Sequence, residues 1–190
     1  IQRGESKCNL GDNNGAILDY TKAIKLKPDS DTAYYNRGVV KRELKDYSGA
    51  ILDFNKSIEL NSYSEKAFHN RGESKLKLND YDGAILDFNK AIELNPDYAF
   101  AYNSRGNVKR ALQDYEGSIL DFSKAIELNP YYEEAYYNRA LSKGHFKNRY
   151  EESILDFKKV IDLNPQEGKA YEFIGYLKNQ LNQNYCPELK

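Results

Sequence analysis

Two histidines and two cysteines are the side chains best suited to catalysis or metal binding in this 190-residue chain. His69 and His145 belong to distant parts of the sequence, and Cys8 and Cys186 lie near its opposite ends. Neither cysteine has metal-ligand spacing to another Cys or to a His. The sequence contains no HExxH, CxxC, GxSxG or phosphate-binding glycine loop. We therefore predict two free thiols, no catalytic residue, no metal site and no cofactor, so the chain is not expected to be an enzyme.

The composition narrows the class of partner. The 28 basic and 29 acidic residues nearly cancel, so no strong field favours nucleic acid or an anionic membrane. Hydrophobic residues make up 40% of the chain, enough for a packed core. No stretch approaches the roughly 20 apolar residues of a membrane-spanning helix, so no membrane insertion is expected. The chain starts with Ile and contains no Met, so we expect a piece of a longer protein. Its compartment stays unknown, with the cytoplasm favoured.

An internal repeat accounts for most of the sequence, and a repeat of this length is typical of stacked arrays. Its full copies begin 34 residues apart, at Ala33, Ala67, Ala101 and Ala135. The last of these copies contains one extra residue between Lys143 and Tyr150. An earlier copy begins in mid-unit at Ile1, and a sixth begins at Ala170 without a second half.

Each unit contains two segments with helical spacing. In the third full copy, Tyr102 and Arg105 lie on one side of a first helix, and Ile119 and Phe122 on one side of a second. An Asp precedes each second segment as a suitable N-cap, namely Asp46, Asp80 or Asp114. Prolines that would end the second segment follow it, namely Pro28, Pro96, Pro130 and Pro165. Two such helices cannot bury their apolar faces alone, so neighbouring units must stack.

The unit resembles the tetratricopeptide repeat in its length and in the residues at its characteristic positions. In the third full copy these residues are Tyr102, Gly106, Ser118, Phe122, Ala125 and Pro130. The resemblance implies an all-α fold, a right-handed superhelical α-solenoid of about five and a half 34-residue helix-turn-helix repeats. It also implies a concave groove that binds peptides or proteins. The related pentatricopeptide arrays bind RNA, but their units are longer and typically basic, so no nucleic-acid partner is expected.

The resemblance also suggests how the array is divided. A single array should span 1–190, with units at approximately 1–30, 31–64, 65–98, 99–132 and 133–166, a capping helix at 167–183 and a short tail at 184–190. Close approach of two helices is expected at small residues, namely Gly4, Gly38, Gly72 and Gly106, with Ala16, Ala50 and Ala84. The capping helix should pack through a stripe of Ala170, Ile174, Leu177 and Leu181. Its other face carries Tyr171, Phe173 and Tyr176, which leaves end-to-end self-association open.

Three charged columns depart from the family pattern. They are Arg3, Arg37, Arg71, Arg105 and Arg139, then Lys7, Lys41, Lys75, Lys109 and Lys143, then Asp19, Asp53, Asp87, Asp121 and Asp156. Because an unpaired charge at a packed seam is costly, we expect each Asp to bind an Arg of its own unit. The sixth half-unit has Ile174 in place of Arg but keeps Lys178, which favours a Lys that reaches back to the preceding Asp. A solvated stripe of charges is the alternative.

In this family the first helix of each unit lines the groove, which makes one column a candidate peptide site. One place before each Arg stand Gln2, Asn36, Asn70, Ser104 and Asn138. An Asn amide can donate and accept at once, so the column resembles the Asn ladder with which some tetratricopeptide proteins hold an extended peptide. The alternative is that these amides satisfy neighbouring helix ends or water.

The groove around this column should present Tyr35, Val39, His69, Glu73, Phe100, Asn103, Asn107, Tyr137 and Leu141. Aromatic rings flanked by amides would form a rigid platform for a peptide, although Tyr35 and Tyr137 could equally be ordinary residues of the array. The chaperone-binding carboxylate clamp of the family is incomplete. Asn36 and Asn70 match its Asn site, and Lys66 could match a basic site, but the required Lys and Asn are replaced by Ile1 and Glu5, or by Tyr35 and Val39 one unit on.

The sequence thus predicts a protein-protein interaction scaffold that binds a peptide or partner protein of unknown identity in the groove. One alternative is a self-assembly or structural module that acts through its terminal faces. Another is an accessory region of a larger enzyme whose catalytic domain lies outside these residues.

Overall fold

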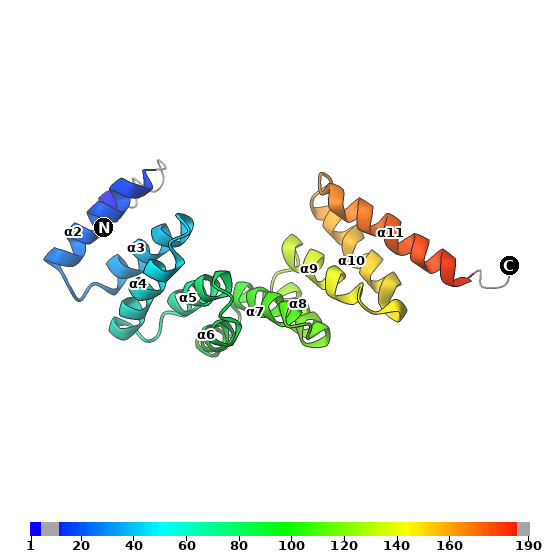
Figure 1. Cartoon of the computed structure of the whole chain (residues 1–190), viewed down its shortest axis with the longest axis horizontal. Helices are drawn as coiled ribbons and strands as arrows, with labels where there is room; N and C mark the ends of the chain where they lie inside the picture. Colours follow the sequence, from blue (N-terminus) through cyan, green and yellow to red (C-terminus); the bar gives the residue numbers. More distant parts are fainter. Residues whose placement is uncertain (5–11, 186–190) are drawn as a thin grey trace. The chain divides into compact units, whose positions relative to one another are not determined.

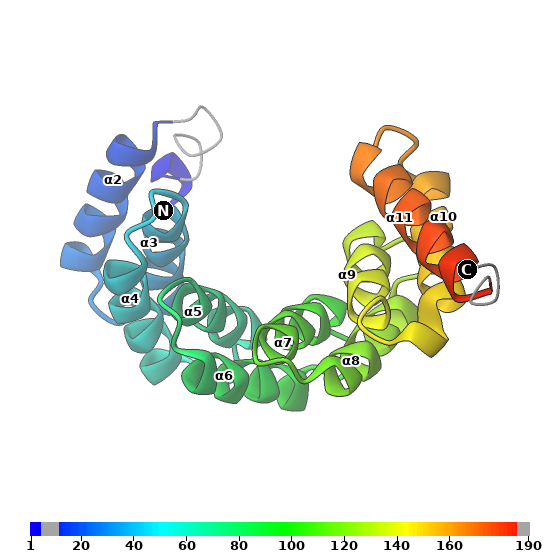
Figure 2. The ribbon, with the colours of Figure 1, turned by 45° about the vertical axis from the view of Figure 1, so that its right-hand side comes forward.

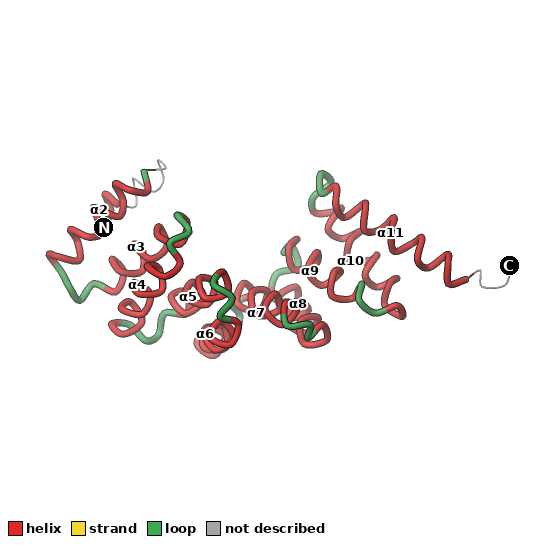
Figure 3. Tube along the Cα trace, viewed as in Figure 1, coloured by secondary structure: helices red, strands yellow, loops and turns green. Residues whose placement is uncertain are grey.

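The computed structural model of the chain describes residues 1–4 and 12–185, with side chains through residue 182. The described residues form helices joined by short turns, without a strand among them (Figure 3). They fall into two compact units, each of which contains several repeats. From here on, unit 1 is Ile1–Pro96 and unit 2 is Asp97–Lys190. The expectations for Glu5, Lys7, Cys8 and Cys186 concern residues outside the described ranges.

Unit 1 is a row of antiparallel helix pairs (Figure 1). Its helices are α2 (Asn13–Leu26), α3 (Asp31–Glu43), α4 (Tyr47–Leu60), α5 (Glu65–Lys77) and α6 (Tyr81–Leu94). The first helix of each repeat packs on its second helix, as α3 does on α4 and α5 on α6, and successive repeats join where α4 packs on α5. Helices α3, α4 and α5 therefore each bury their apolar stripe against two neighbours.

Unit 2 repeats this arrangement and ends in a longer helix (Figure 2). Its elements are α7 (Ala99–Ala111), α8 (Tyr115–Leu128), α9 (Glu133–Lys143), the 3₁₀ turn η1 (Lys147–Arg149), α10 (Tyr150–Leu163) and α11 (Gly168–Tyr185). Here α7 packs on α8, α8 on α9, α9 on α10, and α10 on α11. The all-α fold class predicted from the repeat is confirmed.

The predicted Asp N-caps of the second helices are confirmed. The carboxylates of Asp46, Asp80 and Asp114 accept hydrogen bonds of 2.9–3.0 Å from the backbone N–H three residues on. That third residue is a glycine in each case, and a Cβ there would lie 2.1–2.3 Å from Oδ2, the other oxygen of the capping carboxylate. Helix α10 is different because Arg149 precedes it and no side chain caps it. The extra residue of this repeat is taken up by η1.

A single residue in the left-handed conformation turns the chain between the helices of a repeat. It is Lys45, Asn79 or Gln113, with φ of 64°, 62° and 63°. The next residue, the capping Asp, donates its backbone N–H to a carbonyl of the first helix at 2.9–3.0 Å. This closure satisfies carbonyls that the helix end would leave unpaired. It also places the second helix directly against the first.

The ends of the second helices depend on an Asn that the sequence analysis overlooked. Helix α4 stops at Leu60 although no proline follows it, because Asn61 adopts an extended conformation there. The Asn61 side chain accepts from the backbone N–H of Tyr63 at 3.2 Å and donates to Asp31 at 3.0 Å. This second bond ties the end of α4 to the start of α3, and it lowers the pKa of the Asp31 carboxyl. Asn164 makes the equivalent bond to Glu133 at 3.1 Å.

The core of each repeat forms where an aromatic ring of the second helix lies over a glycine of the first. Phe54, Phe88 and Phe122 are fully buried. A Cβ on the facing Gly38, Gly72 and Gly106 would lie 2.7–2.8 Å from a ring carbon. In these three repeats the ring lies too close to the first helix for a Cβ. In the fifth repeat Ala140 takes this place, opposite Phe157.

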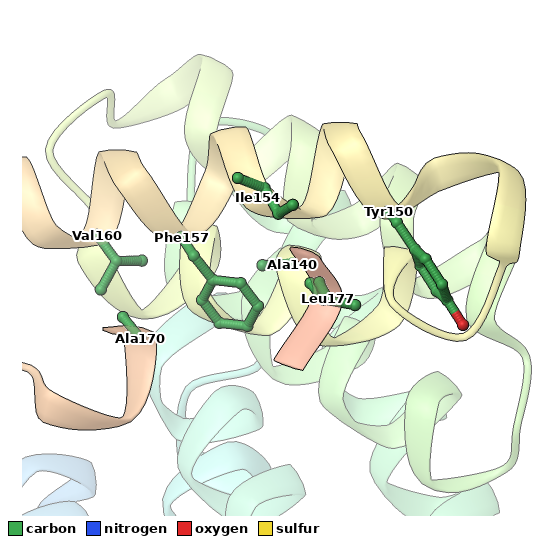
Figure 4. Close-up of a cluster of buried hydrophobic side chains, with 7 residues drawn as sticks. All are labelled: Ala140, Tyr150, Ile154, Phe157, Val160, Ala170 and Leu177. Carbon is green, nitrogen blue, oxygen red and sulfur yellow. The ribbon is translucent and has the colours of Figure 1, made fainter. Parts of the chain in front are cut away.

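Helix α11 covers the second helix of the fifth repeat. Ala170 and Leu177 are buried in one cluster with Phe157 and Val160 (Figure 4). Phe173 was expected on the opposite, outward face. Instead its ring stacks on Phe157, with centroids 5.3 Å apart. It belongs to the seam because it follows Ala170 by three residues, within one turn of the packing stripe.

Candidate partner-binding surface

Each buried Asp of the charged columns is held by an Arg of the same repeat. The four pairs are Arg37–Asp53, Arg71–Asp87, Arg105–Asp121 and Arg139–Asp156, with Nε–Oδ2 distances of 2.9 Å in all four. The second nitrogen, Nη2, donates to Oδ1 at 2.5–2.7 Å. These Asp residues are only 3–5% exposed. The geometry is bidentate, the arrangement that best compensates a carboxylate removed from water.

The Lys column contacts the Asp of its own repeat, so the expectation of a Lys reaching back to the preceding repeat is wrong. Lys41, Lys75, Lys109 and Lys143 place Nζ at 2.8–2.9 Å from the same Oδ2 that accepts from the Arg. The reason is helical spacing, because each Lys follows its Arg by four residues and so faces the same second helix. Lys178 is exposed, and no ion pair involves it within the part of the chain that the structure describes.

A third contact of the Arg joins successive repeats and was not foreseen from the sequence. Arg37 Nη1 donates to Thr21 at 3.0 Å, Arg71 Nη1 to Asn55 at 2.8 Å and Arg139 Nη1 to Ser123 at 3.1 Å. Each acceptor lies on the second helix of the preceding repeat. A small polar residue two places after four of the five Asp residues was the signal that could have revealed it, namely Thr21, Asn55, Asn89 and Ser123. These columns are therefore structural joints between helices.

The Asn column is buried, which limits the peptide-holding role expected for it. Asn70, Ser104 and Asn138 are 6–8% exposed. The Asn70 amide donates to the Tyr35 hydroxyl at 3.1 Å and to the Lys66 carbonyl at 2.8 Å. Asn138 donates to Asn103 at 3.3 Å, and Asn103 is itself only 2% exposed. These amides bond to side chains of the neighbouring first helix and to a carbonyl of their own helix, rather than to helix ends. Asn36 is half-buried and Gln2 exposed.

The other candidates differ in how much they present to a partner. Phe100 is 51% exposed and packs edge-on against Tyr132, with ring centroids 5.2 Å apart. Tyr35, Val39, His69, Glu73, Asn107, Tyr137 and Leu141 are half-buried. Burial raises the pKa of the Tyr35 and Tyr137 hydroxyls. Burial also lowers the pKa of His69, against the smaller opposite effect of Glu73. The half-buried rings thus present only part of their surface to a partner.

Two pockets lie beside arginines that the sequence analysis did not single out. In unit 1, Arg42, Glu43, Tyr47, Glu73 and Lys77 line a pocket of about 170 Å³. In unit 2, a pocket of about 200 Å³ lies beside Arg110 and is walled mainly by apolar and aromatic side chains. Arg42 and Arg110 occupy the same position of their repeats, two 34-residue steps apart. Each therefore lies near the C-terminal end of a first helix, α3 or α7.

The two histidines have separate surroundings. His69 lies in unit 1 with its ring 5.6 Å from that of Phe88. His145 lies in unit 2 and stacks on Tyr115 with centroids 3.7 Å apart. In the described part of the chain, no three His, Cys, Asp or Glu residues gather in an arrangement able to hold a metal ion. None of the described helices combines the length and apolarity needed to cross a membrane.

Comparison with protein families matches nearly all of the repeats. A family described as TPR repeat matches residues 4–42 and 106–143. Two families described as tetratricopeptide repeat match residues 65–98, and residues 31–63 and 133–167. No curated protein sequence matches the chain.

Solved structures of repeat proteins superpose on most of the chain. The crystal structure of MamA is 26% identical, with 87% of this chain and 96% of that chain covered at a TM-score of 0.78. The structure of YrrB is 23% identical, with 90% and 88% covered at 0.73. A tetratricopeptide repeat protein from Parabacteroides merdae ATCC 43184 is 22% identical, with 97% and 73% covered at 0.79. The repeat, its glycine–phenylalanine seams and these matches together place the chain in the tetratricopeptide repeat family.

Proposed function

We propose that this chain is a scaffold that binds a peptide or a partner protein through the first helices of its repeats. The helices concerned are α3 and α5 in unit 1, and α7 and α9 in unit 2. The observation that carries the proposal is the pocket found at an equivalent place in each unit, beside Arg42 and beside Arg110. Pockets of this size suit single side chains, as expected for a surface that reads an extended chain residue by residue.

The comparisons support a polypeptide partner. The family is one of interaction scaffolds, and the structure of YrrB is described as that of a TPR protein with an unusual peptide-binding site. This chain has a similar fold over most of its length. Recognition by a preformed surface requires no catalytic group, because affinity comes from burial and hydrogen bonding on rigid helices.

The exposed aromatic patch of α7 offers a contact area for such a partner. Phe100 is held by Tyr98 and Tyr132, whose ring centroids lie 5.9 Å and 5.2 Å away. A ring fixed in this way loses little conformational freedom on binding. In this proposal the buried amides Asn70 and Asn138 keep the first helices in register, and the partner contacts the rings and the pockets.

A peptide-display selection followed by NMR mapping tests the proposal. The probe is a random octapeptide library, and recovered peptides are titrated into the isotope-labelled chain. We expect shifts on α3, α5, α7 or α9, and weaker binding by Phe100→Ser. Leu120→Ser is the matched control, since Leu120 is 71% exposed but lies on the second helix α8. Failure to enrich any peptide, or shifts confined to second helices, would contradict the proposal.

A second candidate is self-association through the end of unit 2. Gly175 of α11 has no atom within 4 Å of its Cβ position, whereas the equivalent Gly106 faces Phe122. Beside it, Tyr171 is 52% exposed. This face of α11 could therefore accept a helix of a second copy. A concentration series by light scattering tests this candidate, with Tyr171→Lys expected to abolish any dimer. A monomer at all concentrations would exclude it.

A further inference from the structure

Arg110 carries a charge that has no carboxylate partner among the described residues. Its Nη2 donates only to neutral acceptors, the side-chain oxygens of Asn107 at 3.3 Å and Asn138 at 3.4 Å. Its Nε is buried and has no hydrogen-bond acceptor within the described part of the chain. The carboxylate of Glu134 favours the charged form of Arg110 without forming an ion pair with it, and it accepts a hydrogen bond from Asn103 at 3.1 Å. Burial lowers the pKa of this guanidinium, which indicates that its charge is poorly compensated.

The pocket beside Arg110 exists because the next repeat lacks a side chain at the equivalent place. Thirty-four residues after Arg110 stands Gly144, and both residues line the pocket. In unit 1 the residue 34 places after Arg42 is Leu76. Gly144 has ordinary right-handed helical angles, φ −63° and ψ −10°. A Cβ on it would lie 3.4 Å or more from its neighbours. The backbone therefore does not require glycine there, and the side-chain volume is left open.

The pocket beside the equivalent arginine in unit 1, Arg42, is lined by carboxylates, whereas the Arg110 pocket is not. Glu73 lines the same pocket as Arg42 and supplies a carboxylate from the following first helix. The residue of unit 2 that corresponds to Glu73 in this relationship is Leu141, which lines the Arg110 pocket. The Arg42 pocket thus contains both cationic and anionic side chains. The Arg110 pocket contains the guanidinium of Arg110 among mainly apolar and aromatic side chains. The second pocket is complementary to an anionic group brought by another molecule.

We propose that the Arg110 pocket receives a glutamate side chain of the bound peptide, with Arg110 as its counterion. This inference rests on the proposed peptide-binding function and names one residue of the partner. A carboxylate can accept two parallel hydrogen bonds from a guanidinium, which is the strongest neutral-pH pairing available to Arg. The methylene groups of Glu would pack against Leu141 and Phe173, which line the pocket.

The lining favours a side-chain carboxylate over the carboxylate at the C-terminus of a peptide. A terminal carboxylate is attached to a backbone amide, which loses free energy if it is buried without an acceptor. Ser153 is fully buried, and its hydroxyl donates to the Ala140 carbonyl at 2.7 Å. Phe157, Phe173 and Leu177 offer no side-chain acceptor, so among the lining side chains His145 and Tyr176 remain as acceptors for an incoming amide. A Glu side chain brings its charge without such an amide.

The test uses octapeptides selected on the whole chain from a random library and synthesised with C-terminal amides. We expect the binders to share a Glu whose replacement by Gln weakens binding roughly ten- to hundredfold, the range for a hydrogen-bonded charge. On Arg110→Gln the Glu and Gln peptides should bind equally. Arg42→Gln is the matched control and should keep the full preference for Glu.

Gly144→Leu tests the pocket separately from the charge. It keeps Arg110 but fills the open volume, and should weaken the Glu peptides by a similar factor. Circular dichroism and thermal unfolding check that each variant is folded. We expect Arg110→Gln to unfold at the same temperature as the wild type or higher, because it removes a half-buried charge without an ion pair.

The possible outcomes separate this inference from the proposed function. If no peptide is enriched, both are wrong. If peptides bind but share no Glu, or if the Glu preference survives in Arg110→Gln, the inference is wrong and peptide binding stands. If binding requires a free C-terminal carboxylate instead, the pocket reads the terminus and the assignment to a Glu side chain is overturned.

Discussion

Arg37 donates two parallel hydrogen bonds to Asp53, from Nε to Oδ2 at 2.9 Å and from Nη2 to Oδ1 at 2.7 Å. Lys41 contacts the same carboxylate at 2.8 Å, and Arg37 also donates to Thr21 on the preceding second helix at 3.0 Å. One buried carboxylate thus organises three helices, α2, α3 and α4. The hydrogen bond to Asp53 raises the pKa of Arg37.

Removing the Asp53 carboxylate alone should therefore lower the free energy of unfolding more than replacing Arg37, Lys41 and Asp53 together. We predict that Asp53→Ala destabilises the chain by about 3 kcal/mol, because Arg37 and Lys41 are left close together without a counter-charge. The combined variant Arg37→Leu, Lys41→Met and Asp53→Leu should lose much less, since an apolar seam replaces the ions. Urea unfolding followed by circular dichroism measures both. A combined variant as unstable as Asp53→Ala would refute this account.

The glycine under each buried phenylalanine should tolerate no side chain. Gly106→Ala would bring a Cβ to 2.7 Å from the ring of Phe122, which is fully buried between helices. We predict a loss of about 1–3 kcal/mol from overpacking. Gly175→Ala is the matched control, since it occupies the same repeat position on α11 and has open space around it. It should be neutral or stabilising, because Ala favours a helix. Thermal unfolding that ranks the two variants alike would count against the packing argument.

The features predictable from the sequence were those that depend on local chemistry. The helix pairs, the capping Asp46 and the small residue Gly38 follow from spacing and residue type within one repeat. The Arg37–Asp53 contact could be anticipated because two opposite charges recur together. The predicted contact of the Lys column with the preceding repeat was wrong. The four-residue spacing that puts Lys41 beside Arg37 determines its partner, and the composition of the sixth repeat does not.

Other features depend on distances between helices that a sequence does not contain. Asn70 looks like a surface amide by type and repeat position, but packing of α3 against α5 buries it to 8% exposure. The Arg110 pocket is open because Gly144 has no side chain, although in the sequence this glycine looks like an ordinary helix end. Arg42 and Arg110 also sit at helix ends, where a basic residue has an ordinary explanation in the helix dipole.

The left-handed turn residues offer a way to stabilise the chain. Gln113 has φ of 63° between α7 and α8, a conformation that costs a residue with a side chain about 1 kcal/mol. Gln113→Gly should therefore raise the stability by up to about 1 kcal/mol, and Lys45→Gly should do the same in unit 1. Gln113→Ala keeps the Cβ and is the control, for which no gain is expected. The midpoint of urea unfolding reports the difference. An equal gain from Ala would show that loss of the Gln side chain, and not relief at Cβ, is responsible.

His69 should make unit 1 sensitive to acid. Burial lowers its pKa in the folded chain, Arg42 acts in the same direction and Glu73 opposes both. The unfolded chain, with an ordinary His pKa near 6.5, then binds a proton more readily than the folded chain does. The contribution of neutral His69 to stability is therefore complete above about pH 6.5 and is lost as the pH falls from there toward the lowered folded value.

The variant His69→Tyr isolates this effect, because Tyr35 and Tyr137 occupy the equivalent position in other repeats. Melting temperatures are compared at about pH 7.5 and about pH 5.5, on either side of the ordinary His pKa. Between these two pH values the melting temperature of the wild type should fall further than that of His69→Tyr. Glu73→Gln should enlarge the loss, because it removes the carboxylate that supports the protonated ring 4.0 Å away. If the wild type and His69→Tyr lose the same amount, other groups carry the acid sensitivity, and the burial of His69 has no measurable consequence.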